Sequence, residues 1–217
     1  MQFLSHPGSL STMYLLARTT LENRNYQDAA SRYADIFIEL TDKGIDPPSS
    51  TFIAEYSYAL NMIGNCDVAL DKLSLNNANT DFEKAVVAHS LFLSQNYREC
   101  EKIVNQLELT GENWCNKAIL SFLSGDDRAA LQQINNARKN SPNNEQIVRN
   151  AILINFSRPQ TVKAGCVIWL TFCGYQKDHG PEFYQDLIDQ MRLSGNQDEL
   201  TICALENWKR FVLNKPI

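Results

Sequence analysis

The 217-residue sequence lacks the short motifs that identify many enzymes and metal-binding proteins. It contains no GxSxG, no glycine-rich phosphate loop, no HExxH, no DxDxDG calcium loop and no CxxC pair. The three histidines lie far apart, and the spacing assigns no Ser, Cys or carboxylate to His89 as a catalytic partner. We therefore expect no catalytic residues, no metal site and no cofactor, and we expect that the protein is not an enzyme.

Long apolar runs are also missing. The first ten residues, MQFLSHPGSL, have no basic start followed by an apolar run, so they do not form a typical secretory signal. The most apolar stretch, Ala164–Gly174, has eleven residues, whereas a membrane-spanning helix needs about 18 or more. We expect a cytoplasmic protein without a transmembrane segment, although a removed leader or a domain cut from a longer protein would look the same.

An excess of positive charge is absent. Lysine and arginine number 20 against 25 aspartates and glutamates, which gives a net charge of −5, and the basic residues are scattered. Binding to a nucleic-acid backbone normally needs clustered basic residues, so we expect no nucleic-acid partner. Apolar residues make up 44% and charged residues 21% of the chain, which is typical of a folded globular protein.

The sequence has six cysteines but no other sign of a disulfide framework. A chain of this length can bury a sizeable core without disulfides. Cysteine often behaves as a small core residue, so we expect free, buried thiols. These residues are Cys66, Cys100, Cys115, Cys166, Cys173 and Cys203.

A repeated pattern of small residues surrounds four short polar breaks. The breaks are Asn23-Arg24-Asn25-Tyr26, Gly64-Asn65-Cys66, Gln95-Asn96-Tyr97 and Ser124-Gly125-Asp126-Asp127, and their last residues serve as anchors. A small residue stands nine positions before and three positions after each anchor: Ala17 and Ala29, Ser57 and Ala69, Ala88 and Cys100, Ala118 and Ala130. Seven positions after each anchor stands a large residue: Tyr33, Leu73, Val104 or Ile134. Two antiparallel helices joined by a tight turn can approach closely only where small side chains face each other, so each unit is predicted to be a helical hairpin.

The pattern resembles the tetratricopeptide repeat (TPR). The fourth unit matches the TPR signature best, with Trp114, Ala118, Ala130, Ile134, Ala137 and Pro142 at the family's spacing, although Lys117 and Ser121 replace the expected Leu and Tyr. The anchors are 40, 31 and 30 residues apart rather than a uniform 34, and the second and third units lack the Trp and the Pro. The resemblance covers residues 11–142.

The resemblance implies an all-α fold, a right-handed superhelical solenoid of antiparallel helix pairs with C-terminal capping helices. We expect a single domain over residues 1–217, with about four degenerate repeats in 11–142 and further helix pairs and a cap in 143–217. Helical periodicity in the last part marks four helices. Their apolar faces are expected to be Ile147, Val148, Ala151, Ile152 and Phe156, then Thr161–Phe172 between its neighbours, then Phe183, Leu187, Ile188 and Met191, and finally Leu200, Ala204, Trp208, Phe211 and Val212.

The resemblance also implies that the first helix of every hairpin lines a concave groove. The predicted partner-binding residues are Tyr14, Arg18, Tyr58, Asn61, Phe82, His89, Phe92 and Asn116, with Glu22, Glu55, Met62, Ala85, Glu112 and Ile119 beside them. Alternatively, several of these residues are packing residues. The Lys, Asn and Arg residues of the chaperone-binding carboxylate clamp are replaced here by Tyr14 and Arg18, Glu55, and Phe82 and Val86, so a heat-shock chaperone tail is not expected as the ligand.

The expected function is a protein-binding scaffold or a small chaperone. Its groove would hold a peptide or an amphipathic helix of another protein, as in the secretion-system chaperones and pilus-assembly factors that resemble this family. A homodimer is a further option. The alternatives are a TPR-like regulatory or ligand-sensing domain of a longer protein, such as a transcriptional regulator, and an enzyme with an unrecognised site.

Overall fold

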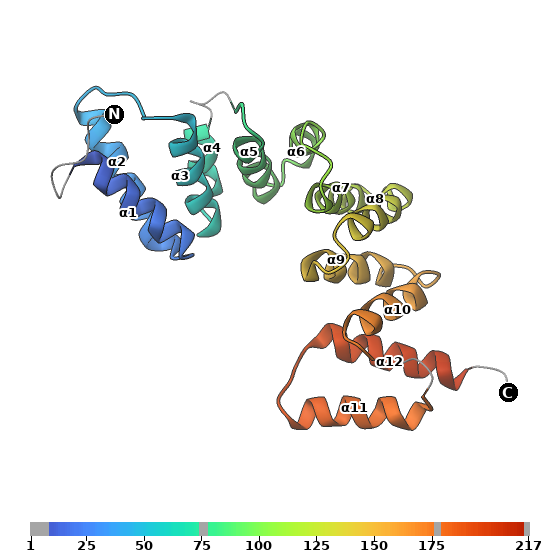
Figure 1. Ribbon diagram of the computed structural model, residues 1–217. Coiled ribbons are helices and arrows are strands. Elements are labelled where there is room, and N and C mark those ends of the chain that lie inside the picture. Colours follow the sequence, from blue (N-terminus) through green and yellow to red (C-terminus); the bar gives the residue numbers. More distant parts are fainter. Residues whose placement is uncertain (1–8, 74–77, 176–178, 215–217) are drawn as a thin grey trace. The chain divides into compact units, whose positions relative to one another are not determined.

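Every regular element in the described part of the chain is an α-helix (Figure 1). The computed structural model describes residues 9–73, 78–175 and 179–214. The helices are α1 (Leu10–Glu22), α2 (Tyr26–Asp42), α3 (Ser50–Met62), α4 (Cys66–Leu73), α5 (Asp81–Leu93), α6 (Tyr97–Val104), α7 (Gly111–Leu123), α8 (Asp127–Asn140), α9 (Glu145–Phe156), α10 (Val162–Phe172), α11 (Pro181–Leu193) and α12 (Glu199–Leu213). They pack in sequential antiparallel pairs, which confirms the all-α prediction. None of these helices is long and apolar enough to cross a membrane.

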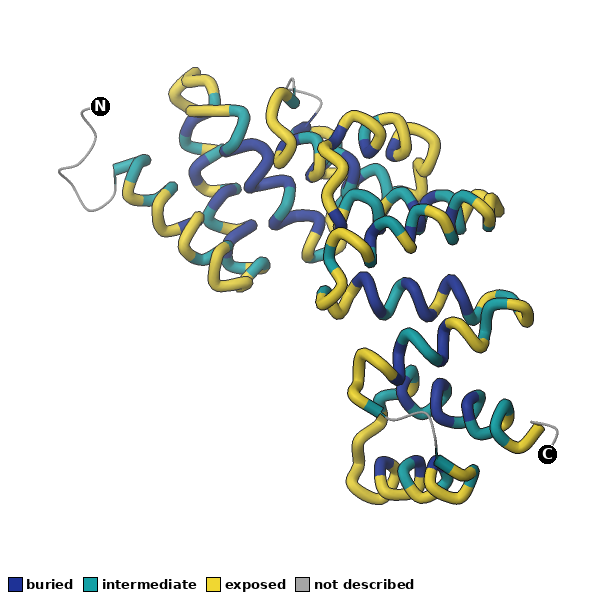
Figure 2. The backbone as a smooth tube through the Cα atoms, turned by 45° about the vertical axis from the view of Figure 1, so that its right-hand side comes forward, coloured by how far each residue is buried: buried dark blue, intermediate teal, exposed yellow. Residues whose placement is uncertain are grey.

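The chain divides into two compact units. Unit 1 spans Met1–Glu108 and contains α1 to α6, and unit 2 spans Leu109–Ile217 and contains α7 to α12. Each unit holds three helix pairs and has its own hydrophobic core. Figure 2 shows buried residues along one side of the helices and exposed residues along the other, as expected for amphipathic helices.

The four predicted hairpins are confirmed. Each anchor is the first residue of a second helix, namely α2, α4, α6 or α8. The eight small residues around the anchors are at most 6% exposed, and the four large residues that follow are at most 5% exposed. In two hairpins a polar small residue donates directly to the facing backbone: Ser57 Oγ lies 3.4 Å from the carbonyl oxygen of Ala69, and Cys100 Sγ lies 3.2 Å from that of Ala88. The small residues therefore mark the places where the paired helices meet.

The turns inside these hairpins share one backbone geometry. Each contains a residue with positive φ, and the next backbone N–H donates to a carbonyl five residues earlier over 2.8 to 3.2 Å. This is the Schellman ending of a helix, which favours glycine at the residue with positive φ. Those residues are Arg24 (60°), Gly64 (84°), Gln95 (59°) and Gly125 (82°). Two of the four turns therefore hold a side chain where glycine would be less strained.

The last four helices lie where the sequence predicts them, and α10 packs between α9 and α12. One face needs correction. On α11 the fully buried aromatic residue is Tyr184, whereas Phe183 is 37% exposed. The indole N–H of Trp208 donates to the Tyr184 hydroxyl over 3.2 Å, and Phe183 instead stacks on His179 before the helix. A shift of one residue turns a helical side chain by about 100°, which exchanges the two rings.

All six cysteines are free, as predicted. Cys100, Cys115 and Cys166 are buried, as predicted, and this burial raises the pKa of each of the three thiols. Cys66 and Cys203 are partly exposed, and Cys173 is exposed, so the prediction that all six are buried was wrong.

The small-residue contacts predict a large effect of overpacking. Ala130→Leu should lower the free energy of unfolding by about 1–3 kcal/mol, because the added side chain forces α7 and α8 apart. Lys139→Leu, at an exposed position of the same helix, should change it by less than about 0.5 kcal/mol. Urea titration measures both, and equal midpoints would refute the close contact.

The positive φ at Gln95 predicts that Gln95→Gly stabilises the protein. The left-handed conformation costs a residue with a side chain about 1 kcal/mol, and glycine avoids this strain. The gain in stability is partly offset by the greater freedom of glycine in the unfolded chain. The same change at Gln132, on the exposed side of α8, should instead destabilise by about 1 kcal/mol. Thermal unfolding of both variants tests this, and a loss of stability in Gln95→Gly would contradict it.

Candidate functional site

Charged side chains in unit 1 are concentrated on the second helices. On α6, the residues Arg98, Glu99, Glu101 and Lys102 are all exposed. In α3 the only charged residue is the buried Glu55, and α5 has no charged residue after Lys84. The solvent side of α3 and α5 is therefore uncharged over most of its length.

Large uncharged side chains lie on one side of α3 and α5, and these two helices pack against each other. On α5 they are spaced by seven and four residues, and on α3 by four, so they share a helical face. Met62, Phe82 and Leu93 are 40%, 44% and 39% exposed, while Tyr58 and His89 are partly buried. We call these five residues the uncharged face of unit 1: Tyr58, Met62, Phe82, His89 and Leu93.

An aromatic row runs through this face. The Tyr58 ring lies 6.3 Å from the His89 ring and 6.1 Å from the Tyr26 ring. Burial, together with a hydrogen bond to Tyr26, raises the pKa of Tyr58, and burial lowers the pKa of His89. Both side chains are therefore neutral at pH 7, and the row offers aromatic contact area without charge.

Two other predicted groove residues meet at the buried Glu55 carboxylate. The hydroxyls of Tyr14 and Tyr33 donate to Glu55 Oε2 over 2.8 and 3.0 Å, and Arg18 Nε lies 3.4 Å from Glu55 Oε1. Burial, together with these hydrogen bonds, raises the pKa of both tyrosines, so both remain donors. The Tyr14 hydroxyl is therefore bound within the protein, while Arg18 stays exposed and also pairs with Glu22 at 3.4 Å.

Asn61 and Phe92 have internal partners as well. Asn61 is 4% exposed, its amide donates to Ser90 Oγ over 2.8 Å, and the serine hydroxyl lies 3.1 Å from Asn61 Oδ1. This pair joins α3 to α5. The Phe92 ring lies 5.5 Å from the Tyr97 ring across the turn to α6.

The predicted residues thus have different surroundings. The structure brings Tyr58 and His89 together, places Phe82 on the same face, and gathers Tyr14 and Arg18 at Glu55. Asn116 is exposed on α7 and belongs to unit 2. Sequence reasoning missed Leu93, which follows His89 by four residues and could have been found by that spacing, and Tyr26, which was used only as an anchor.

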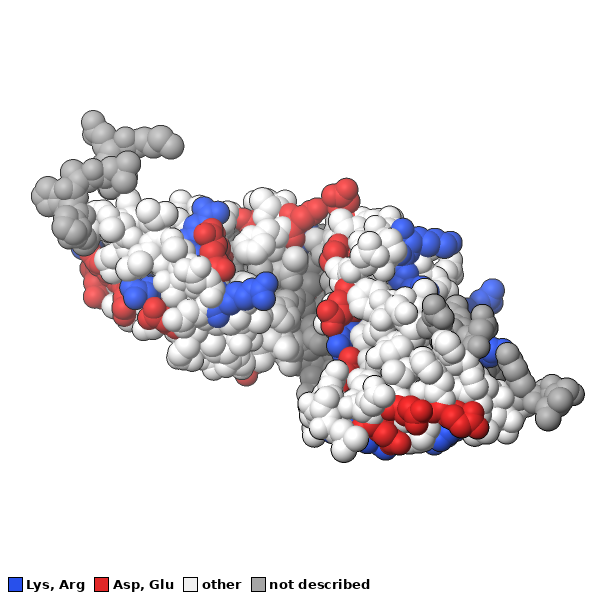
Figure 3. All heavy atoms as spheres, turned by 60° about the horizontal axis from the view of Figure 1, so that its bottom comes forward, with Lys and Arg blue, Asp and Glu red and all other residues white. Residues whose placement is uncertain are grey.

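The described residues show neither a metal cluster nor a broad basic surface on the face in view. No group of three or more His, Cys, Asp or Glu side chains that could hold a metal ion occurs among them. On the face drawn in Figure 3, the lysines and arginines of the described residues lie in small separate groups, some of them beside aspartates and glutamates.

Comparison with solved structures shows that the chain has a TPR-like fold. The structure described as the MamA RS-1 ArsTM double mutant matches with a TM-score of 0.60 and 8% identity over 76% of this chain and 93% of that chain. PilF of Pseudomonas aeruginosa matches with a TM-score of 0.59 and 12% identity over 95% of this chain and 93% of that chain. No family model matches the sequence, and no curated protein does. At these identities the likeness concerns the fold.

The Glu55 cluster predicts a graded loss of stability. Glu55→Ala should lower the free energy of unfolding by about 3 kcal/mol, because the buried Tyr33 hydroxyl and the part-buried Tyr14 hydroxyl lose their acceptor. Tyr14→Phe removes one charge-assisted hydrogen bond and should cost about 1.5 kcal/mol. Glu22→Ala, which breaks only an exposed pair with Arg18, should cost less than about 0.5 kcal/mol. Urea unfolding ranks the three, and a Glu55→Ala variant as stable as Glu22→Ala would contradict the cluster.

Proposed function

We propose that the chain is a protein-binding scaffold and that the uncharged face of unit 1 holds a peptide or an amphipathic helix of a partner protein. The observation that carries the proposal is the composition of this face: three aromatic rings, one methionine and one leucine, with no charge among them at pH 7. Aromatic residues and methionine are enriched in protein interfaces, and charged residues are depleted at interface cores.

The support beneath the face favours binding without rearrangement. The Asn61–Ser90 pair and the Tyr58–His89 contact hold α3 and α5 in one arrangement. A face built on packed helices loses little conformational freedom when a ligand binds, which increases affinity. An apolar segment would cover Met62, Phe82 and Leu93. Because the five residues of this face carry no charge, none of them would lose the hydration of a charged group on binding.

The TPR-like fold is consistent with this proposal, because helical-repeat proteins use surfaces formed by successive helices for binding. A role as a small chaperone or assembly factor in the cytoplasm is one form of it. The partner's segment would be recognised by its apolar side chains at helical or extended spacing, since the face offers contact area rather than ion pairs.

Adding charge to the uncharged face should weaken partner binding strongly. We expect Met62→Lys with Phe82→Lys to weaken binding by roughly 30-fold or more, since a central interface residue commonly contributes about 2 kcal/mol. Val68→Lys is the matched control, because Val68 is 45% exposed but lies on the second helix α4.

The measurement is capture of partners by the tagged chain from source-cell extract, followed by titration of the partner segment identified by mass spectrometry. The melting temperatures of all three proteins should agree within a few degrees, because the substituted side chains are exposed. Retention of the partner by the double variant together with its loss in Val68→Lys would place binding on the second helices and overturn the proposal.

A further inference from the structure

The first helix of unit 1 exposes positions that the corresponding helices bury. In α3, the residues 14, 11, 10 and 7 positions before the anchor are all buried: Phe52, Glu55, Tyr56 and Ala59. In α5 the same positions are buried or partly buried: Glu83, Val86, Val87 and Ser90. In α1 they are all exposed: Thr12, Leu15, Leu16 and Thr19. Leu15 and Leu16 are 63% and 49% exposed, so two leucines face solvent at a helix-packing position.

In α3 and α5 these positions pack against the preceding hairpin. The Tyr56 ring stacks on Tyr33 of α2 at 6.0 Å, and Ser90 bonds to Asn61 of α3. Among the described residues, no helix of unit 1 packs on the corresponding side of α1. The α1–α2 hairpin therefore exposes the same positions that α3 and α5 use to pack against a neighbouring helix, but no described helix of unit 1 covers them.

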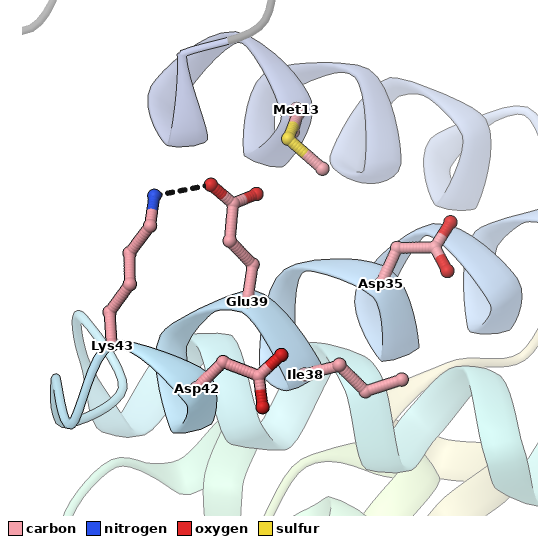
Figure 4. Close-up of a pocket in the computed structure, with 6 residues that line it drawn as sticks. All are labelled: Met13, Asp35, Ile38, Glu39, Asp42 and Lys43. Carbon is pink, nitrogen blue, oxygen red and sulfur yellow. Dashed lines mark hydrogen bonds and ion pairs between the residues drawn. The ribbon is translucent and has the colours of Figure 1, made fainter.

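The second helix of this hairpin extends the surface. A groove of about 520 Å³ lies between α1 and α2 and is lined by Met13, Asp35, Ile38, Glu39, Asp42 and Lys43. Figure 4 shows Met13 on α1 and, below it, the other side chains that line the groove. Ile38 is 57% exposed, and Met13 precedes Leu16 by three residues on the same side of α1. We call the surface formed by Met13, Leu15, Leu16 and Ile38 with Asp35, Glu39 and Asp42 the terminal face.

On the terminal face, Leu15, Leu16 and Ile38 are each about half exposed or more. A solenoid hairpin that no neighbouring repeat covers normally carries a polar outer face. Exposed apolar side chains that lie together on one surface often mark an interaction site, whereas apolar residues scattered singly over a surface do not. The terminal face therefore has the properties of a docking surface.

The charges around the groove indicate the chemistry of its partner. Asp35, Glu39 and Asp42 follow one side of α2 at spacings of four and three residues, beside Ile38. Glu39 pairs with Lys43 at 2.5 Å, whereas no ion pair joins Asp35 or Asp42 to a cation among the described residues. The groove thus combines the apolar side chains of Met13 and Ile38 with a net negative charge, and complementary charge would come from lysine or arginine.

We propose that the terminal face docks an amphipathic helix of a partner protein that carries lysine or arginine beside its apolar side chains. The apolar side of that helix would cover Leu16, Met13 and Ile38, as α3 covers α2 within the unit. Its basic side chains would pair with Asp35 and Asp42. This site is separate from the uncharged face and does not depend on the function proposed for it.

The experiment uses the full chain and two synthetic amphipathic helices, one of leucine and lysine and one in which glutamate replaces every lysine. We expect saturable one-to-one binding of the lysine helix by calorimetry and no binding of the glutamate helix. Methyl NMR shifts should be centred on Met13 and Ile38.

Matched variants locate the site. D35N with D42N, and separately L16S with I38S, should each weaken binding of the lysine helix about tenfold or more. E99Q with E101Q removes two exposed carboxylates from α6 of the same unit and should leave the affinity unchanged. All substituted positions are exposed, so circular dichroism should show the same helix content and melting temperature within a few degrees.

Four results would overturn the proposal. Equal binding of the two peptides would show that charge does not select the ligand. If E99Q with E101Q weakened binding equally, the net negative charge of the whole protein, and not the terminal face, would attract the lysine helix. A dimer in sedimentation experiments that L16S with I38S dissociates, without peptide binding, would make a second copy the occupant. Binding only by a chain that begins at Gly8 would assign the face to residues 1–7.

Discussion

The close approach of two helices within each hairpin is the contact on which the rest of the structure depends. Ala17 and Ala29 in the first hairpin, and Ala118 and Ala130 in the fourth, are completely buried. Where serine or cysteine takes this place, its side chain donates to the facing carbonyl oxygen, as Ser57 does to Ala69. The contact is therefore kept both by small volume and by satisfied polar atoms, which a close-packed interior requires.

This contact fixes the direction of every other side chain on the first helix. Positions are counted back from the anchor, so that −9 is the small residue that points at the second helix. In α3 and α5, positions −14, −11, −10 and −7 then face the preceding hairpin, and positions −8 and −4 lie on the uncharged face. Tyr58 and His89 occupy position −8 in successive hairpins, which is why their rings meet at 6.3 Å. Met62 and Leu93 occupy position −4 and are exposed. The uncharged face is thus a consequence of the register that the small residues set.

The same register explains what the sequence could and could not predict. The hairpins, their turns and the anchor positions were predictable, because small residues and turn residues act over short sequence distances. The surroundings of Asn61 and Glu55 were not, because their partners Ser90 and Tyr14 lie 29 and 41 residues away. One step along a helix turns a side chain by about 100°, so a residue beside the solvent-facing stripe can instead face a neighbouring hairpin. Sequence spacing alone does not distinguish a polar residue that binds a partner from one that ties two hairpins together.

The two surfaces of unit 1 differ in what lies beneath them. Nine residues of α3 are buried, because hairpins pack on both of its sides, whereas only Ala17 is buried in α1. Helical stability comes mainly from tertiary packing, so α1 depends on fewer contacts than α3 does. Local opening of a protein begins where buried contacts are few, so α1 is expected to open before α3. A ligand that binds only the folded hairpin raises its stability by mass action. A helix docked on the terminal face would therefore supply α1 with the kind of packing that α3 and α5 receive from their preceding hairpins.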